Sequence, residues 1–167
     1  FLRWNTYDTR SGIYRESTPP EEVVFDLEHL EVLDARIRIA IVPRSAEHAT
    51  LKLYSMKPLS FIETLTTLGN LGLGVTGEIH IPTRLPDGQR VHLYRYEIED
   101  SGPRIAALIV SVERLGDAIR ALNEGRASDG SLNALILSAD LDWRQVEVLR
   151  TFRNHLQQIR PHYNVET

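Results

Sequence analysis

Residues 51–98, LKLYSMKPLSFIETLTTLGNLGLGVTGEIHIPTRLPDGQRVHLYRYEI, contain the pattern of strands and helices from which the fold class can be predicted. The first four of them, 51–54, alternate in character, which predicts a half-buried strand. Ser60 and Glu63 then form a capping box, which predicts that a helix begins at this point. We expect the buried face of this helix to consist of Phe61, Ile62, Leu65 and Leu68.

Three glycines follow this helix: Gly69, Gly72 and Gly74. Their spacing superficially suggests a nucleotide-binding loop. A dinucleotide fingerprint, however, follows a strand and opens a helix, so that the phosphate meets the helix N-terminus. Here the glycines follow a helix and precede a strand, so we expect one of them to be a left-handed C-terminal cap.

The second half of the stretch predicts a pair of strands. Residues 75–81 form the first strand, with Val75, Ile79 and Ile81 on one side, and residues 91–98 form the returning strand. The turn between them is Pro86-Asp87-Gly88.

A further helix is expected to begin between Arg104 and Val112. The continuous apolar run Ile105–Val110 fits a helix or a strand equally well, because periodicity alone does not distinguish them. The apolar stripe of the helix is Leu108, Val112, Leu115, Ile119 and Leu122.

The order strand, helix, strand, strand, helix is the beginning of a ferredoxin-like βαββαβ unit. No last strand is evident after Leu122, but residues 36–42 alternate and predict an extra strand that could fill that edge of the sheet. The predicted fold class is therefore α+β, an antiparallel sheet with helices on one face, followed by a helical hairpin.

Helices also flank this unit. Thr18-Pro19-Pro20-Glu21 predicts a capped helix start, and an apolar face of Val23, Leu27 and Leu30 carries this helix to about Leu33. Near the other end, a short helix is followed by a longer one that Asp142 and Gln145 cap. The expected faces are Leu132, Leu135, Ile136 and Ala139 in the short helix, and Trp143, Val146, Leu149, Phe152, Leu156 and Ile159 in the long one.

Composition excludes several classes of function. The chain has 167 residues, 42% of them hydrophobic and 25% charged, which is normal for a packed domain. Its net charge of −4 argues against nucleic acid as a partner, and it has no cysteine for disulfides, thiolate chemistry or zinc–thiolate sites. No apolar run approaches a membrane span. We expect a cytoplasmic protein, and a start at Phe1 without methionine suggests a piece of something larger.

The chain shows no constellation typical of an active site. Ser111, Ser128 and Ser138 lack the context of a nucleophile elbow, and the acidic residues are scattered. His80 and His92 flank the predicted turn and could face each other across two strands, but two imidazoles without a third ligand bind metal weakly. We predict no catalytic, cofactor-binding or metal-binding residue in this chain.

Two weaker signals concern binding. The loop Met56–Ser60 leads into a helix N-terminus, where backbone amides and Lys57 could hold a carboxylate, although capping alone explains Ser60. The candidate effector residues are Lys57, Ser60, Asn70 and Gly72.

The last helix carries Arg144, Arg150, Arg153 and Arg160, which fit a phosphate-binding stripe, a solvated face or an interface with the rest of a larger protein. We favour the interface, and its candidate residues are Trp143, Arg150 and Phe152.

Several stretches resemble the large bacterial NAD-specific glutamate dehydrogenases. Residues 121–137, ALNEGRASDGSLNALIL, are similar to the family's GRAxDGxLNxLxL stretch, and residues 139–150, ADLDWRQVEVLR, to its AGLSWREVxLLR helix. Residues 58–73 resemble its LSDVLPLLENLGL segment, and residues 14–16 and 24–28 match its pattern further upstream. The chain departs from the family at Gly69, at Gly74 and at residues 79–81.

The resemblance implies an ACT-like α+β domain at residues 35–124, preceded by an extension and helix at 1–34 and followed by a helical motif at 125–167. The parent enzyme would convert L-glutamate to 2-oxoglutarate and ammonia with NAD. Its catalytic domain would lie outside this chain, since no catalytic residue of the family maps here.

The resemblance also bears on partners. The chain would contact the rest of the same polypeptide and other subunits of a homo-oligomer, and an amino-acid effector is a further candidate. We expect assembly rather than sensing, and no nucleic acid or membrane as a partner. The alternative is a stand-alone amino-acid-binding ACT-type sensor module.

Overall fold

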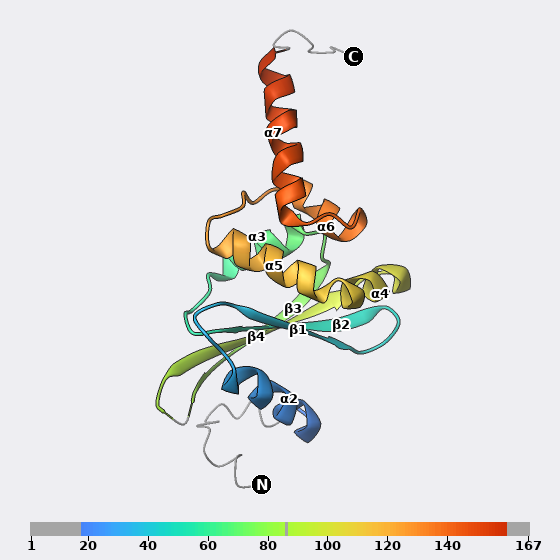
Figure 1. The fold of residues 1–167 in the computed structure, drawn as a ribbon. Coiled ribbons are helices and arrows are strands. Elements are labelled where there is room, and N and C mark those ends of the chain that lie inside the picture. Colours follow the sequence, from blue (N-terminus) through green and yellow to red (C-terminus); the bar gives the residue numbers. More distant parts are fainter. Residues whose placement is uncertain (1–17, 86, 160–167) are drawn as a thin grey trace.

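A computed structural model describes residues 18–85 and 87–159 of the chain (Figure 1). Its four strands form one antiparallel sheet in the order β1-β2-β4-β3. The elements, in chain order, are α2 (Pro20–Glu31), β1 (Arg38–Pro43), β2 (His48–Ser55), α3 (Phe61–Asn70), β3 (Val75–Arg84), β4 (Arg90–Glu99), α4 (Gly102–Val110), α5 (Val112–Asn123), the 3-10 helix η2 (Ser131–Ala134), α6 (Leu135–Ser138) and α7 (Trp143–Ile159).

The sheet confirms the predicted α+β class. The strands β2, β3 and β4 with the helices α3 and α4–α5 have the order and pairing of a ferredoxin-like unit that lacks its last strand. The extra strand β1 pairs with β2 at the edge where that last strand would lie. The N-terminal strand therefore completes the sheet, as its alternating sequence suggests.

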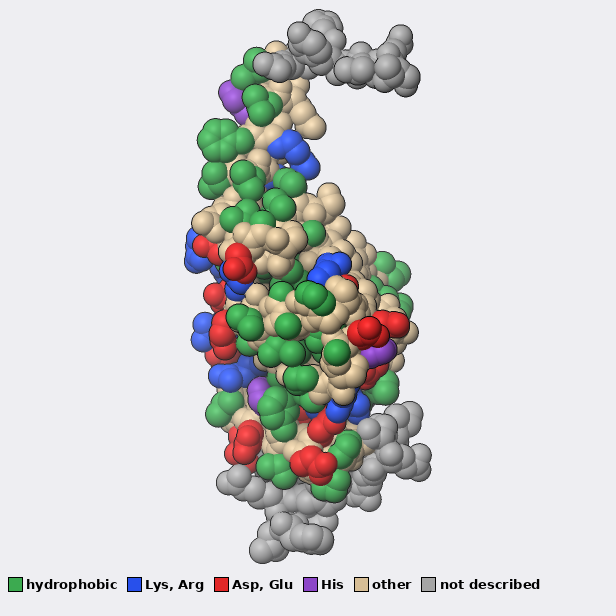
Figure 2. Space-filling view, turned by 90° about the vertical axis from the view of Figure 1, so that its right-hand side faces the viewer, with side chains coloured by type: hydrophobic (Ala, Val, Ile, Leu, Met, Phe, Trp, Pro, Cys, Tyr) green, Lys and Arg blue, Asp and Glu red, His purple; other side chains and the backbone are tan. Residues whose placement is uncertain are grey.

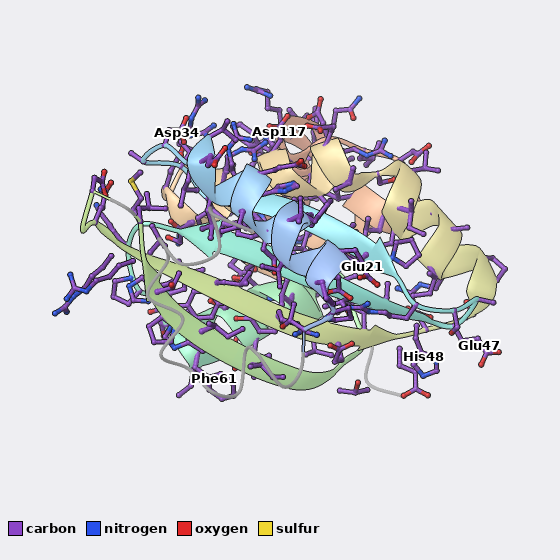
Figure 3. All side chains as sticks on the ribbon, turned by 90° about the horizontal axis from the view of Figure 1, so that it is seen from below. Glu21, Asp34, Glu47, His48, Phe61 and Asp117 are labelled. Carbon is purple, nitrogen blue, oxygen red and sulfur yellow. The ribbon has the colours of Figure 1, made fainter. Side chains whose placement is uncertain are left out.

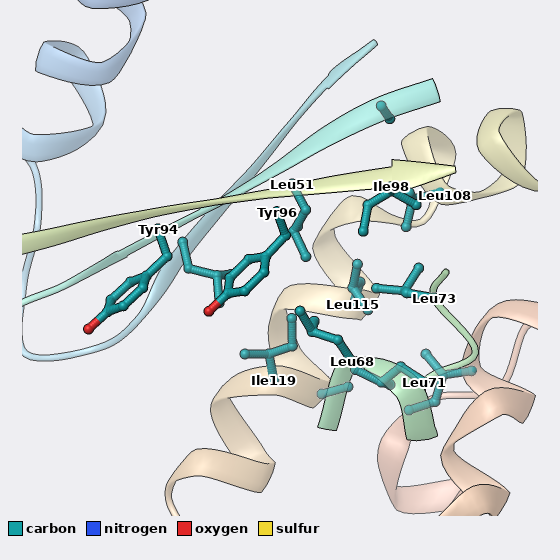
Figure 4. Close-up of a cluster of buried hydrophobic side chains, with 14 of the residues drawn as sticks. Leu51, Leu68, Leu71, Leu73, Tyr94, Tyr96, Ile98, Leu108, Leu115 and Ile119 are labelled. Carbon is teal, nitrogen blue, oxygen red and sulfur yellow. The ribbon is translucent and has the colours of Figure 1, made fainter. Parts of the chain in front are cut away.

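Helices cover both faces of the sheet (Figure 1). Leu51 and Leu53 of β2, with Tyr96 and Ile98 of β4, belong to a core shared with α3, α4 and α5, and Leu115 of α5 is fully buried there (Figure 4). On the opposite face, α2 lies across the strands and packs its own buried residues against them (Figure 3). This second core consists of Val23 and Leu30 of α2, Leu33 just after the helix, and Ala40, Tyr54, Ile81, Val91 and Leu93 of the strands.

The start of β3 contains an irregularity that the sequence pattern does not reveal. Val75 pairs with Ile98, but the next pair is Gly77 with Glu97, so one residue is inserted. A bulge of this kind moves a side chain to the other face of the sheet. Val75 packs in the core beneath α3–α5, whereas Ile79 and Ile81 pack on the α2 face. The prediction that all three share one side is therefore wrong.

Helix α3 begins and ends as predicted. The Ser60 hydroxyl oxygen accepts a bond from the Glu63 amide, and Gly72 adopts the left-handed conformation with φ +84°. The predicted buried face is only partly correct. Leu68 is fully buried and Leu65 is partly buried, but Phe61 and Ile62 are 56% and 74% exposed because the first turn extends past the edge of the core (Figure 3).

The apolar run 105–110 belongs to a helix. Pro103 lies in the first turn of α4, and Ser111 is the single residue that separates α4 from α5. Ile105 and Leu108 reach the core, and so do Leu115 and Ile119 of the predicted stripe.

Helix α2 does not have the predicted capping box. Its N-cap is Pro19, without a capping side chain, and Thr18 instead accepts a hydrogen bond from Nη1 of Arg95 at 3.1 Å. The Thr18 hydroxyl is therefore bound by Arg95 of β4 and does not cap the helix. Val23 and Leu30 are buried and Leu27 is partly buried, as expected.

The last helix begins at the predicted cap. The Asp142 amide donates to Oε1 of Gln145 at 2.8 Å, and the Gln145 amide donates to Oδ1 of Asp142 at 2.9 Å. Only the base of α7 contacts the body, and the rest of the helix stands away from it (Figure 1). None of the helices in the described ranges is long and apolar enough to cross a membrane.

Candidate functional site

The base of α7 is joined to the sheet domain through polar contacts, which we call the α7 junction; its residues are Thr67, Asn70, Ser128, Asp129, Asn133, Glu147 and Arg150. Asp129 links the junction to α3, because its carboxylate accepts bonds from Thr67 Oγ1 at 2.7 Å and Asn70 Nδ2 at 3.0 Å. The side-chain Nδ2 of Asn133 donates to the same carboxylate at 3.3 Å. One carboxylate therefore ties α3 to the loop that leads into α7.

Arg150 supplies the other half of the α7 junction. Its Nη2 donates to the Ser128 carbonyl at 2.8 Å and to Oδ1 of Asn133 at 2.7 Å, and its Nε donates to Glu147 at 3.0 Å. Only 11% of the Arg150 side chain is exposed, and Asn133 is 3% exposed. Hydrogen bonds that involve charged groups in such protected positions are stronger than neutral, exposed ones. The junction is therefore a firm attachment for α7.

A second contact ties the turn before α7 to α5. Arg114 donates from Nη1 to the Asp140 carbonyl at 2.7 Å and forms an ion pair with its carboxylate. Asp140 has φ +60°, a left-handed conformation that few non-glycine residues adopt. The guanidinium groups of Arg126 and Arg144 lie over the Trp143 ring, 5.2 and 4.4 Å from its centroid. The base of α7 is thus held from two sides.

Beyond its base, α7 has an uncovered apolar surface, which we call the α7 stripe (Figure 2). Val146 in the first turn is 1% exposed, and it is the only buried residue of the helix. The residues of the α7 stripe, with their exposed fractions, are Val148 (54%), Leu149 (43%), Phe152 (63%), Leu156 (57%) and Ile159 (60%).

The predicted interface residues therefore have different surroundings. Phe152 belongs to the α7 stripe, whereas Arg150 is held in the junction and Trp143 lies against the guanidinium groups of two arginines. The sequence pattern identifies the apolar side of α7 but does not indicate which part of it the chain itself covers.

The predicted effector residues are not gathered in one place. Lys57 and Ser60 precede the first turn of α3, while Asn70 and Gly72 lie at its other end, about 15 Å away for a helix of this length. Asn70 holds Asp129, and the Gly72 carbonyl accepts a bond from Arg104 at 2.6 Å.

A groove of about 270 Å³ runs between α3 and α5 next to the α7 junction. Ser60, Glu63, Thr64 and Asp129 are among its polar lining residues. Its apolar lining residues are Ile37, Leu53, Leu59, Leu68, Ile119 and Leu122.

On the other face of the sheet, α2 is attached by a charged cluster. Lys52 of β2 is fully buried, and its Nζ lies 2.7 Å from Asp26 and 3.0 Å from Glu22. Arg44 also pairs with Glu22, and this hydrogen bond is the main reason why the pKa of Glu22 falls from 4.5 to about 2. Sequence reasoning missed this cluster, although a lysine inside an alternating strand was a signal for it.

His80 and His92 face each other across β3 and β4, as the sequence suggests. Nε2 of His80 lies 3.0 Å from Nδ1 of His92, and the His80 ring stacks on Tyr94 at 4.4 Å. Burial lowers the pKa of both imidazoles. Within the described ranges, no three histidine or carboxylate side chains gather in a way that could hold a metal ion.

Comparisons with known proteins match the chain at two levels. Residues 127–167 match the family described as glutamate dehydrogenase, helical motif 3. A longer match, 30% identical over 153 residues, is with the NAD-specific glutamate dehydrogenase of Pseudomonas aeruginosa, and it covers 88% of this chain but 9% of that protein. Two further matches are with the enzymes of the same name from Halomonas elongata (29% identical over 169 residues) and Mycobacterium tuberculosis (24% identical over 156 residues). They cover 92% and 89% of this chain, respectively, and 10% of each of those proteins.

The chain thus spans about one tenth of the length of these curated relatives. The comparisons confirm the resemblance to NAD-specific glutamate dehydrogenases that the sequence motifs indicate.

Proposed function

We propose that this chain, similar along nearly its whole length to one segment of NAD-specific glutamate dehydrogenases, is a non-catalytic structural segment of such an enzyme. The parent enzyme would oxidise L-glutamate to 2-oxoglutarate and ammonia with NAD, in the cytoplasm, through a catalytic domain outside this chain. The segment would fix contacts between this region and the rest of the polypeptide or other subunits of a homo-oligomer.

The α7 stripe is the observation that carries this proposal. Its side chains are 43–63% exposed over three turns, although the base of the same helix is held by the α7 junction. Contiguous apolar surface of this kind is typical of protein–protein contacts. A firm base with an uncovered end suits an element that positions one part of a large enzyme against another.

Replacing Phe152 and Leu156 with serine in the full-length enzyme tests the assembly role. We expect the oligomer to dissociate at concentrations at which the unmodified enzyme stays intact, measured by light scattering after size-exclusion chromatography. The matched control is Val110→Ser, because Val110 is 85% exposed but lies outside the α7 stripe. Intact oligomers in the double variant, with unchanged stability, would refute an assembly role for α7.

Amino-acid sensing is the second candidate function, and the groove between α3 and α5 is the observation that favours it. A regulatory amino acid must bind one arrangement of the domain more tightly than another. Thermal-shift measurements with a panel of amino acids test this role. Absence of any saturable response up to millimolar concentrations would exclude it.

A further inference from the structure

The α7 stripe has the geometry of a helix-pairing surface. Leu149, Phe152, Leu156 and Ile159 follow one another at steps of three, four and three residues. At about 100° per residue, these side chains and Val148 fall within a band about 100° wide. This band begins about 60° around the helix from Val146, whose side chain the body buries. The stripe therefore points away from the chain's own core.

The charge along the borders of the α7 stripe is the positive charge of Arg153, and no described border residue is a carboxylate. Arg153 lies along one border and His155 along the other, and the described part of α7 has no carboxylate after Glu147. Within the described ranges, the only hydrogen bond of Arg153 is a long one of 3.4 Å to the Asn154 side chain. The guanidinium is thus free to meet an acidic partner, unlike that of Arg150.

A second copy of this chain is a poor occupant of the α7 stripe. In a pair of copies, each helix would bring Arg153 to the contact, and neither described helix would bring a carboxylate to meet it. The described stripe is also shorter than two heptads, whereas coiled coils that are stable on their own extend over three or four.

We propose that the α7 stripe binds an amphipathic helix from elsewhere in the enzyme, with an apolar seam of 3-4 spacing and Asp or Glu along its borders. This inference rests on the proposed structural role and adds the chemistry of the partner. Border charges select the partner in helix pairing, while the apolar seam supplies most of the affinity. Three turns bury less than the roughly 800 Å² per partner of an independent interface. Attachment to the same assembly, which raises the effective concentration, compensates for the small area.

Two synthetic helical peptides test the chemistry of the partner. They share one apolar seam of 3-4 spacing and differ only in their border residues, glutamate in one and lysine in the other. Fluorescence anisotropy of the labelled peptides, titrated with this chain, should show about tenfold tighter binding of the glutamate peptide. Added salt should reduce this preference, because exposed charges are screened.

Variants of the chain locate the binding. Arg153→Glu should remove or reverse the preference, and Arg153→Gln should weaken it without introducing a new charge. The double variant Phe152→Ser, Leu156→Ser should bind both peptides more weakly, while Val110→Ser should leave the affinity for both unchanged. All of these side chains are exposed, so circular dichroism should show the same folded body in each variant.

Equal affinity for the two peptides, or no binding of either up to about 1 mM, would overturn the inference. Sedimentation of the chain alone provides a separate check. Self-association that Phe152→Ser abolishes would also overturn it, in favour of a second copy, and would leave the structural role standing. The structural role itself fails only if the full-length oligomer is indifferent to the stripe variants.

Discussion

At the scale of single residues, Arg150 and Arg153 show that arginines close together on the last helix can have different roles. Three residues accept hydrogen bonds from the Arg150 guanidinium group: Ser128 and Asn133 lie 22 and 17 residues away, and Glu147 lies on the preceding turn. The sequence offers Arg150 and Arg153 as equivalent members of one charged face. The structure separates them, since the first is enclosed and the second is exposed.

Replacing Arg150 with methionine should lower the free energy of unfolding by about 2 kcal/mol, because buried hydrogen-bond acceptors lose a charged donor. Urea denaturation followed by circular dichroism measures the change. Arg153→Met is the matched control and should alter stability by no more than about 0.5 kcal/mol. Equal effects of the two substitutions would contradict the enclosed position of Arg150.

Glu22 gives the attachment of α2 a defined pH dependence. Its pKa is about 2 in the folded chain and 4.5 ordinarily, so folding favours the charged form. The stabilisation is complete above about pH 4.5 and is lost as the pH falls towards 2. The difference in stability between the unmodified chain and Glu22→Gln should therefore be constant above pH 4.5 and shrink below it. A difference that does not vary with pH between 5 and 2 would contradict this account.

At the scale of helices and strands, the sequence predicts those features that depend on residues close together in the chain. The caps of α3 and α7 involve residues three positions apart, and both were predicted correctly from sequence. The cap proposed for α2 failed because Thr18 bonds to Arg95, 77 residues away. The bulge in β3 likewise depends on its pairing with β4 and left no local signal.

The α7 junction could not be predicted for the same reason. Asp129 is 62 residues from Thr67 and 59 from Asn70, so nothing within the last third of the chain reveals its partners. The motif of residues 121–150 was visible as a resemblance, but its physical role as an attachment emerged only from the fold.

Gly72 ends α3 in the left-handed conformation. A Cβ there would lie 3.1 Å from the Arg104 guanidinium and 3.5 Å from Ala134, at a φ of +84°. Gly72→Ala should therefore lower the melting temperature, with a cost of about 1 kcal/mol for the left-handed conformation alone. Gly69→Ala is the matched control, since open space surrounds that position, and it should raise stability by up to about 1 kcal/mol. The reverse order of the two melting temperatures would contradict the cap assignment.

At the scale of the whole molecule, the order of elements was sufficient to predict the sheet. A ferredoxin-like unit without its last strand needs an additional strand, and the alternating residues 36–42 supplied one. The sequence did not place α2, which covers the face opposite to the other helices and buries Lys52. Nor did it show that the apolar side of α7 continues beyond the body.

If the α7 stripe is a docking surface, it is covered in the complete enzyme. Hydrogen–deuterium exchange of residues 150–159, compared between the full-length enzyme and the isolated 167-residue chain, tests it most directly. Docking should suppress the opening of these exposed turns, so we predict exchange at least about tenfold slower in the full-length enzyme. Equal exchange rates in the two proteins would show that the stripe stays uncovered and would contradict the account.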